Sequence, residues 1–292
     1  MIRTWLRAIR LRFLLASVIA VSNGIAYAFW KNKQIDISNA VLTFGGVICL
    51  HASIDLLNDY WDYKRGIDTT TRRTKFSGGT GVLPENLLKP STVYSVRLIL
   101  LLVGSLVGMY FVVIRGIVIA LILGFAILAV YFYSTNIVNL GLGEAFVAAK
   151  GILIVVGAYY VQTSSIGLGV VYVGIIMGIL SASVLFVNSF PDYQADRSGG
   201  RRTLVILLGR QRAVKIFPWI ILSTYIIILA GVWLGYLKIY SLGSLLSLPF
   251  AVMAIKRLGK SYQDVDQLVS VMGVTVAYSR VTSIVLAVSL FI

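Results

Sequence analysis

The sequence predicts an all-α polytopic membrane protein with about nine transmembrane helices. Hydrophobic residues make up 58% of the 292-residue chain, and its mean hydropathy is +0.89. Most of the length falls into apolar runs of about 18–22 residues, the length that an α-helix needs to cross a bilayer core. The charged residues, 13% of the chain, gather mainly between these runs. We therefore expect a single transmembrane domain over residues 1–292.

Each apolar run is a predicted membrane-spanning helix. Their ranges are 13–30, 37–57, 92–113, 115–133, 142–163, 168–188, 212–235, 239–256 and 266–292. The first run ends near Ala26-Tyr27-Ala28, a pattern that also occurs at signal-peptide cleavage sites. We expect this run to be retained, because the number of spans and the charge distribution work with it. The last run gives the weakest signal because Arg280 interrupts it.

The distribution of lysine and arginine predicts which helix ends face the cytoplasm. With the N-terminus inside, the cytoplasmic segments hold 19 of the 26 Lys and Arg residues, and the outer segments hold 4. Cytoplasmic loops of membrane proteins carry such an excess. We therefore expect a multi-pass protein of the cell (inner or cytoplasmic) membrane, with its N-terminus in the cytoplasm and its C-terminus outside. The same rule accounts for the net charge of +15 without nucleic acid binding.

A few polar residues fall inside the apolar runs. A charged side chain that faces lipid is costly, so we expect Arg97, Lys150 and Arg280 to face protein or a water-filled cavity. The single histidine, His51, fits a packing or hydrogen-bonding role better than a metal site. The single cysteine, Cys49, permits no intrachain disulfide.

Two acidic clusters stand out against the apolar pattern. The first acidic cluster follows the second run and the second follows the sixth; their members are Asn58, Asp59, Asp62 and Asp68, and Asn188, Asp192 and Asp196. An Asn and an Asp stand four residues apart in both, so they share a face if each cluster extends a helix. Four crossings separate the clusters, which places both on the cytoplasmic side. Mg²⁺ often binds through a few carboxylates and substrate phosphates, so we interpret the clusters as halves of one magnesium diphosphate site.

Basic residues follow both clusters. They are Arg72, Arg73 and Lys75 after the first, and Arg197, Arg201 and Arg202 after the second. Arginine binds phosphate oxygens through paired hydrogen bonds, so arginines beside carboxylates favour a metal-bridged polyanion over a simple cation site. A role in membrane topology alone is the alternative. The run Ser77–Gly81 lacks the Lys-Ser/Thr ending of a P-loop, and we expect a flexible segment over the site, with anion contact open.

Several side chains near the helix ends are candidates for the reacting region. Tyr131, Tyr133, Tyr159, Tyr160 and Gln162 lie at the ends of the fourth and fifth runs. Aromatic faces attract cations, so tyrosines that line a cavity can stabilise a carbocation. An interfacial aromatic belt is the alternative, and it is favoured for the last two tyrosines. Glu144, at the inner start of the fifth run, is the better candidate. Lys150 follows it after six residues, about 240° around a helix, so we expect it on another face.

The two clusters also carry a family resemblance. Asn58-Asp-Tyr-Trp-Asp62-Tyr-Lys-Arg-Gly66-Ile-Asp68, together with Asn188-x₃-Asp192-x₃-Asp196-x₃-Gly200-Arg-Arg-Thr-Leu204-x₃-Leu208-Gly209-Arg210, resembles the UbiA superfamily of intramembrane prenyltransferases. Gly141-Leu-Gly-Glu144 and Tyr159-Tyr-Val-Gln162 make it most similar to the 1,4-dihydroxy-2-naphthoate polyprenyltransferase branch of menaquinone synthesis. The resemblance runs from about residue 7 to 215.

The resemblance implies a fold and a reaction. The fold has nine helices around a central chamber that opens to lipid, and a cytoplasmic cap built from loops at about 58–91 and 189–211. The reaction is Mg²⁺-dependent transfer of a polyprenyl group from its diphosphate, through an allylic cation, to an aromatic acceptor. The resemblance implies that the metal ligands are Asn58, Asp62, Asp68, Asp192 and Asp196, and Asp59 is a further candidate beside them. The candidates for binding diphosphate are Asn58, Arg72, Arg73, Lys75, Asn188, Arg202 and Arg10. The catalytic candidates are Asp62, Asp192, Tyr133 and Glu144.

Departures from the family pattern leave the acceptor open. The first helix of the family usually begins Arg-Pro, where this chain has Arg10-Leu11, and the naphthoate branch usually carries Tyr-Thr-x-x-Pro, where this chain has Tyr133-Ser-Thr-Asn136. A 4-hydroxybenzoate-like phenol or an archaeal glycerol phosphate ether lipid is the alternative acceptor. A cation-coupled transporter is the alternative outside enzymes. Transporters place acids near the membrane midplane, whereas the acids here lie at its edge beside arginines, which favours the enzyme.

Overall fold

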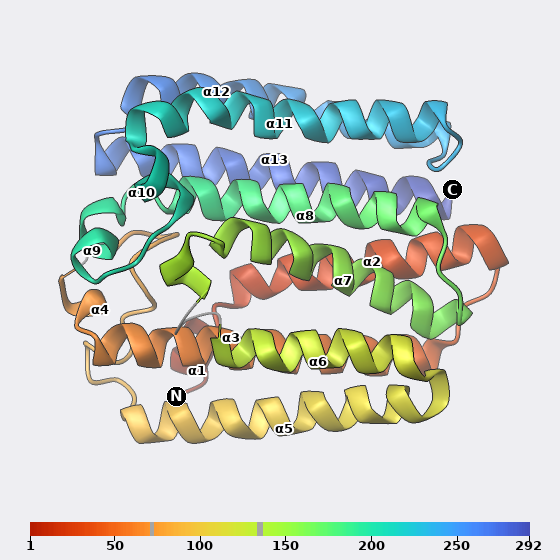
Figure 1. The fold of residues 1–292 in the computed structure, drawn as a ribbon, viewed down its shortest axis with the longest axis horizontal. Coiled ribbons are helices and arrows are strands. Elements are labelled where there is room, and N and C mark those ends of the chain that lie inside the picture. The colour runs from red at the N-terminus through yellow and green to blue at the C-terminus, as the bar shows by residue number, and fades with distance from the viewer. Residues whose placement is uncertain (71–72, 133–136) are drawn as a thin grey trace.

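Long, roughly parallel helices form the body of the protein (Figure 1). The computed structural model describes residues 1–70, 73–132 and 137–292. The long helices are α2 (Leu11–Asn32), α3 (Ile37–Lys64), α5 (Pro90–Arg115), α6 (Ile117–Phe132), α7 (Gly143–Thr163), α8 (Leu168–Asn188), α11 (Arg210–Trp233), α12 (Leu248–Ser261) and α13 (Val265–Phe291). The short ones are α1 (Ile2–Ala8), α4 (Ile67–Thr70), α9 (Tyr193–Ser198), α10 (Leu204–Leu208) and the 3₁₀ helices η1 (Ile137–Leu140) and η2 (Ile239–Ser247).

The helices have the length and composition of membrane spans. In the described part of the chain, eight helical segments are long and apolar enough to cross a bilayer, with η2 and α12 counted together, and α6 is a shorter apolar helix of 16 residues. The prediction of an all-helical membrane protein with about nine spans is confirmed. Large apolar side chains such as Leu102, Val113 and Leu121 are exposed on α5 and α6. Such a surface suits contact with lipid chains better than contact with water.

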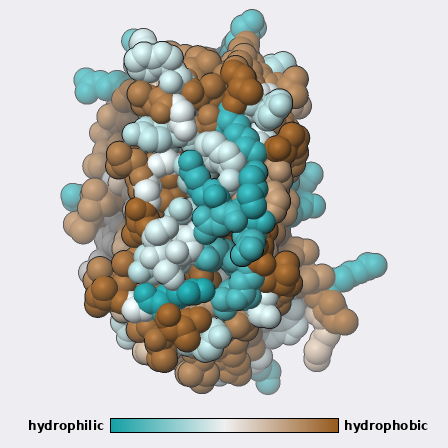
Figure 2. Space-filling model, turned by 90° about the vertical axis from the view of Figure 1, so that its right-hand side faces the viewer, coloured by the Kyte–Doolittle hydropathy of each residue, from teal (hydrophilic) through white to brown (hydrophobic). Residues whose placement is uncertain are grey.

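The two ends of the helix bundle differ. In Figure 1, the short helices α4, α9 and α10 gather at one end with the N-terminus, and the C-terminus lies at the other. We call the first end, formed by residues 65–70, 73–89 and 189–209, the cap. Figure 2 looks onto the opposite end, where hydrophilic side chains collect over the middle of the face and hydrophobic ones surround them. Gln162, in the last turn of α7, ties that helix to the start of α3 there, because its Nε2 donates to the carbonyl oxygen of Asp36 at 3.1 Å.

Helix α3 is long enough to carry its last residues out of the apolar layer. It begins where the Asp36 side chain caps it by accepting a hydrogen bond from the backbone N–H of Asn39 at 2.9 Å. Its 28 residues span about 42 Å, against a hydrocarbon core of about 30 Å. Asn58, Asp59 and Asp62 therefore lie on an extended helix, as the spacing of Asn58 and Asp62 predicts, whereas Asp68 lies on the separate short helix α4.

The second acidic cluster is built differently. Helix α8 ends at Asn188, and Asp192 is the N-cap residue of the next helix, α9. Pro191 lies between them, and the residue before a proline is disfavoured in helical geometry. The expectation that Asn188 and Asp192 share one helix face is therefore wrong, whereas Asp192 and Asp196 do stand one helical turn apart.

Small residues let the central helices pack closely. A Cβ atom at Gly151 of α7 would lie only 3.0 Å from the Cα atom of Gly178 on α8. Glycine at such crossings allows backbones to approach in membrane helices. The large side chains Phe186, Phe217 and Tyr278 fill the adjoining core between α8, α11 and α13. This packing fixes α7 and α8 next to α2, and these helices form walls of the site.

Candidate active site

The last two turns of α3 present three members of the first acidic cluster, Asn58, Asp59 and Asp62, to the cap. Asp59 and Asp62 are 2% and 3% exposed. The Asp59 carboxylate pairs with Arg10 and accepts a hydrogen bond from the Thr80 hydroxyl. The Asp62 carboxylate pairs with Arg201. Each buried carboxylate thus has a cationic partner, as buried charges require.

Arg201 joins the second acidic cluster to the first. Its guanidinium pairs with Asp62, and its Nη1 lies 3.3 Å from Oδ1 of Asp196 on α9. Its Nη2 also donates to Oδ1 of Asn58 at 3.3 Å. The structure therefore brings the two clusters, far apart in the sequence, around one side chain.

The glycine-rich segment Ser77–Gly81 lies between the clusters. The backbone N–H of Gly78 donates to Oδ2 of Asp192 at 3.3 Å. Gly79 has a φ of +72°, and a Cβ atom there would collide with the Asp68 carboxylate. Only glycine fits this position without strain and without displacing the acid. The segment is therefore a structural link over the site as well as the covering segment that the sequence predicts.

Carboxylates crowd one another in the cap. Burial, together with Asp62 and Asp59, raises the pKa of Asp68 to about 7. Burial and the neighbouring Asp196 raise the pKa of Asp192 to about 7. Burial also raises the pKa of Asp196 to about 6. Buried carboxylates that repel one another are poised to exchange their protons for a divalent cation.

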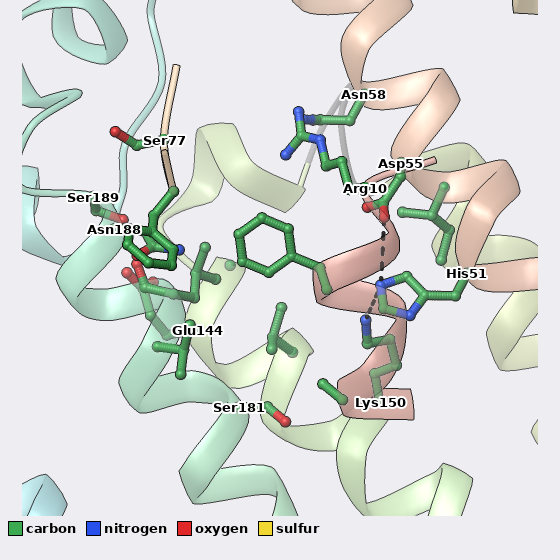
Figure 3. A pocket seen from close by; sticks show the side chains of 18 of the residues that line it. Arg10, His51, Asp55, Asn58, Ser77, Glu144, Lys150, Ser181, Asn188 and Ser189 are labelled. Carbon is green, nitrogen blue, oxygen red and sulfur yellow. Dashed lines mark hydrogen bonds and ion pairs between the residues drawn. The ribbon is translucent and has the colours of Figure 1, made fainter. Parts of the chain in front are cut away.

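A cavity of about 270 Å³ lies under the cap, between α2, α3, α7, α8 and α13. The members of the two acidic clusters that line it are Asn58, Asp62, Asp68, Asn188, Asp192 and Asp196, and Asp55 and Glu144 line it as well. In Figure 3, Asn188 and Glu144 lie on one side of this cavity, and Asn58, Asp55 and His51 lie on the other. The Oδ1 atoms of Asn188 and Asp192 are buried and find no hydrogen-bond partner among the described residues. Two polar oxygens are thus available to a ligand.

This set of donors fits Mg²⁺. The ligands offered are carboxylate and amide oxygens, which Mg²⁺ prefers, and two of those oxygens are buried and unpaired. Within the described ranges, no three His, Cys, Asp or Glu residues are placed to hold a metal by themselves. Mg²⁺ commonly keeps water and substrate phosphates as ligands, so a partial protein set is what a Mg²⁺–diphosphate site requires.

Arg10 and Glu144 line the same cavity. Arg10 precedes α2, and Asp59, which does not itself line the cavity, holds its guanidinium. The Glu144 carboxylate accepts a hydrogen bond from the backbone N–H of Leu204 at 3.3 Å, which ties α7 to the cap.

The remaining predicted residues lie elsewhere. Arg73 and Lys75 line a neighbouring hollow of about 800 Å³, where Arg73 pairs with Glu85. Arg202 is exposed and lines neither space. Arg72 and Tyr133 lie outside the described residues.

The basic residues predicted inside the spans avoid lipid. Arg97 is 2% exposed, and its guanidinium lies 4.4 Å from the centre of the Tyr94 ring. Lys150 and Arg280 line the cavity, and Nη2 of Arg280 donates to the carbonyl oxygen of Arg12 at 2.8 Å. Lys150 shares this cavity with Glu144, although the two were expected on different helix faces. The cavity is wide enough that residues on two different faces of α7, Glu144 and Lys150, both line it.

A second, apolar cavity of about 130 Å³ continues the first between α3, α5, α6 and α7. Residues such as Val107, Leu123 and Ala129 line it. The residues common to both cavities are Ser17, His51, Ile54, Lys150 and Ile154. The space below the cap therefore changes from polar to apolar along its depth.

Comparisons with known sequences and with solved structures agree with one another. A model of the UbiA prenyltransferase family matches residues 16–278. The 1,4-dihydroxy-2-naphthoate octaprenyltransferase of Bacillus subtilis (strain 168) is 26% identical over 262 residues, 88% of this chain and 82% of the relative. The 2-carboxy-1,4-naphthoquinone phytyltransferase of Synechocystis sp. is 26% identical over 271 residues, 91% and 85% of the two chains. A UbiA homolog from Archaeoglobus fulgidus bound to GPP and Mg²⁺ superposes with a TM-score of 0.70 at 15% identity, covering 97% of this chain and 99% of the other, which confirms the fold.

Proposed function

The chain belongs to the UbiA prenyltransferase family, and from this premise we propose that it transfers a polyprenyl group to an aromatic acceptor, with Mg²⁺ as its cofactor. The observation that carries the proposal is the meeting of the two acidic clusters around Arg201, above a cavity that becomes apolar with depth. A diphosphate head group suits the first part of this space and an isoprenoid chain suits the second.

The metal site would use oxygen ligands from both clusters. They are Asn58, Asp62, Asp68, Asp192 and Asp196, with Asn188 beside them. Bound Mg²⁺ would supply positive charge that neutralises the diphosphate and makes it a better leaving group. Arg10 and Arg201 lie beside these carboxylates and would bind diphosphate oxygens.

The residues of the chain would assist the reaction in three ways. As the bond between C1 of the prenyl chain and the diphosphate oxygen breaks, both electrons leave with the diphosphate, and Arg10 and Arg201 stabilise the charge that develops. The apolar cavity holds the prenyl chain and keeps water from the allylic cation. The acceptor carbon then gives an electron pair to C1. The ring regains its aromaticity by releasing a proton from that carbon to the Glu144 carboxylate or, where that carbon carries the carboxylate, by releasing CO₂ and keeping the electron pair of the broken C–C bond. Glu144 faces the cavity and would stabilise the positive charge.

We propose 1,4-dihydroxy-2-naphthoate as the acceptor, and thus a role in menaquinone biosynthesis. The support is the name of the Bacillus relative and the motifs that led to this branch. We also propose that the cap faces the cytoplasm. The support is the excess of Lys and Arg on that side and the position of the N-terminus at the cap end of the bundle.

A transfer assay tests this function. Purified protein in detergent would receive a labelled polyprenyl diphosphate and either 1,4-dihydroxy-2-naphthoate or 4-hydroxybenzoate, with and without Mg²⁺. We expect prenylated product from the naphthoate only, and only with the metal. Mg²⁺-dependent release of diphosphate without prenylated naphthoate would contradict the acceptor and leave the ionisation site standing.

A further inference from the structure

A second polar group of side chains lies deeper in the cavity than the acidic clusters. His51 precedes Asn58 by seven residues on α3, and Lys150 follows Glu144 by six on α7, so the group lies about 10 Å further into the membrane layer. Figure 3 shows Lys150, His51 and Asp55 together on one side of the cavity.

Hydrogen bonds fix the arrangement of the deep group. Nζ of Lys150 lies 3.5 Å from Nε2 of His51, and Nδ1 of His51 lies 2.7 Å from Oγ of Ser17. A lysine ammonium only donates, so Nε2 of His51 accepts, and the histidine proton is on Nδ1, which donates to Ser17. Ser17 and His51 therefore hold the ring in place for Lys150.

Lys150 has donors to spare. An ammonium has three N–H donors, and the long contact to His51 is its single hydrogen bond in the described part of the protein. No carboxylate among the described residues comes within 4.0 Å of its nitrogen. A cation within the membrane layer without an anion beside it is costly, and intramembrane charges are typically paired. An anionic ligand at this position would supply the counter-charge that Lys150 lacks.

Asp55 adds an acceptor to the same place. Its Oδ2 atom is buried, lies 3.8 Å from Nε2 of His51 and has no hydrogen-bond partner in the part of the chain that the structure describes. Asp55 and Lys150 both line the polar cavity. A ligand with an anionic group and a hydroxyl group would satisfy both side chains at once.

We propose that Lys150, positioned by His51 and Ser17, binds the carboxylate of the acceptor, and that Asp55 accepts a hydrogen bond from its ring hydroxyl. This inference rests on the proposed function and names the acceptor class as hydroxylated aromatic acids. The anchor lies about two helical turns below the diphosphate site. An aromatic ring held there occupies the space between the anchor and the Mg²⁺-diphosphate ligands, next to the entrance of the apolar cavity.

The test compares two ligands that differ only in the carboxylate. The full chain in detergent, with Mg²⁺ and under reducing conditions, would be titrated with 1,4-dihydroxy-2-naphthoate and with 1,4-dihydroxynaphthalene, and binding followed by ligand fluorescence. We expect the acid to bind the natural protein about ten- to a hundredfold more tightly, the range of one charge-assisted hydrogen bond. Lys150→Met should bring the ratio of the two affinities close to one, and Lys150→Arg should keep most of it.

Controls separate the possible failures. Lys260→Met, at an exposed lysine of α12, should leave the ratio unchanged. The ratio is measured within each variant, so loss of folded protein does not alter it. An unchanged ratio in Lys150→Met, or equal binding of both ligands to the natural protein, would overturn the anchor even where prenyl transfer is found. Lys150-dependent binding of the acid without its prenylation would support the anchor and contradict the proposed acceptor reaction.

Discussion

Arg201 and Arg202 are neighbours with the same side chain and opposite surroundings. Arg201 pairs with Asp62 and Asp196 inside the cavity, whereas Arg202 is exposed. We expect Arg201→Gln to reduce prenyl transfer by about a hundredfold, since it removes a donor from the developing diphosphate charge. Arg202→Gln is the matched control and should stay within about twofold of the natural rate.

The measurement is the initial rate of product formation with labelled prenyl diphosphate at saturating Mg²⁺. Melting curves of both variants check that folded protein is compared, since Asp62 loses a partner in Arg201→Gln. Equal rates in the two variants would contradict the role given to Arg201.

The raised pKa values of Asp68 and Asp192, about 7 each, predict a pH dependence. An unfolded Asp titrates near 4, so the folded, metal-free protein binds more protons than the unfolded chain between about pH 4 and 7. Its stability therefore falls as the pH rises through this window. Mg²⁺ replaces these protons, so we expect the metal to raise the melting temperature more at pH 8 than at pH 6. An equal shift at both pH values would contradict this account.

At the scale of elements, the glycine-rich segment offers a sharp comparison. Gly79 and Gly235 both have positive φ angles, +72° and +74°, so alanine should cost either about 1 kcal/mol of stability. Only at Gly79 does the added Cβ meet a carboxylate, that of Asp68, while nothing lies within 4 Å at Gly235.

We therefore expect Gly79→Ala to weaken the apparent affinity for Mg²⁺ about tenfold, and Gly235→Ala to leave it unchanged. The affinity is obtained from the Mg²⁺ dependence of the transfer rate. A similar affinity in both variants would show that the Gly79 segment does not shape the metal site.

The elements also show how far sequence reasoning reaches. Apolar run length and helical spacing predicted the long α3 and the acids on its last turns, because both are local properties. The helix break after Asn188 has a local cause in Pro191, which disfavours helical geometry at the residue before it, so the i, i+4 spacing alone is misleading there. Which of Arg201 and Arg202 reaches the acidic clusters depends on how the segment between α9 and α10 packs against the end of α3. No local sequence pattern encodes this packing. Lys150 and His51 lie on different helices and 99 residues apart in the sequence, so their contact could be found only from the fold.

At the scale of the whole molecule, the orientation in the membrane can be tested with single cysteines. The native Cys49 would first be replaced by serine, and then Ser198 in the cap or Ser165 at the opposite end by cysteine; both serines are exposed. With intact cells and a membrane-impermeant maleimide, we expect Ser165→Cys to be labelled at once. Ser198→Cys should be labelled only after the membrane is opened. The reverse pattern would place the cap outside and contradict the proposal from the charge distribution.

The central claim is that two acidic clusters from distant parts of the chain form one Mg²⁺-dependent site for a prenyl diphosphate. The most direct measurement is the rate of Mg²⁺-dependent diphosphate release in the natural protein, in Asp62→Asn and in Asp192→Asn, with Asp264→Asn as the control. Asp264 caps α13 away from the cavity, and asparagine caps a helix equally well. The account predicts that either cluster variant loses at least about a hundredfold while the control keeps its rate. Near-natural release in either Asp62→Asn or Asp192→Asn would contradict it, because one cluster would then suffice.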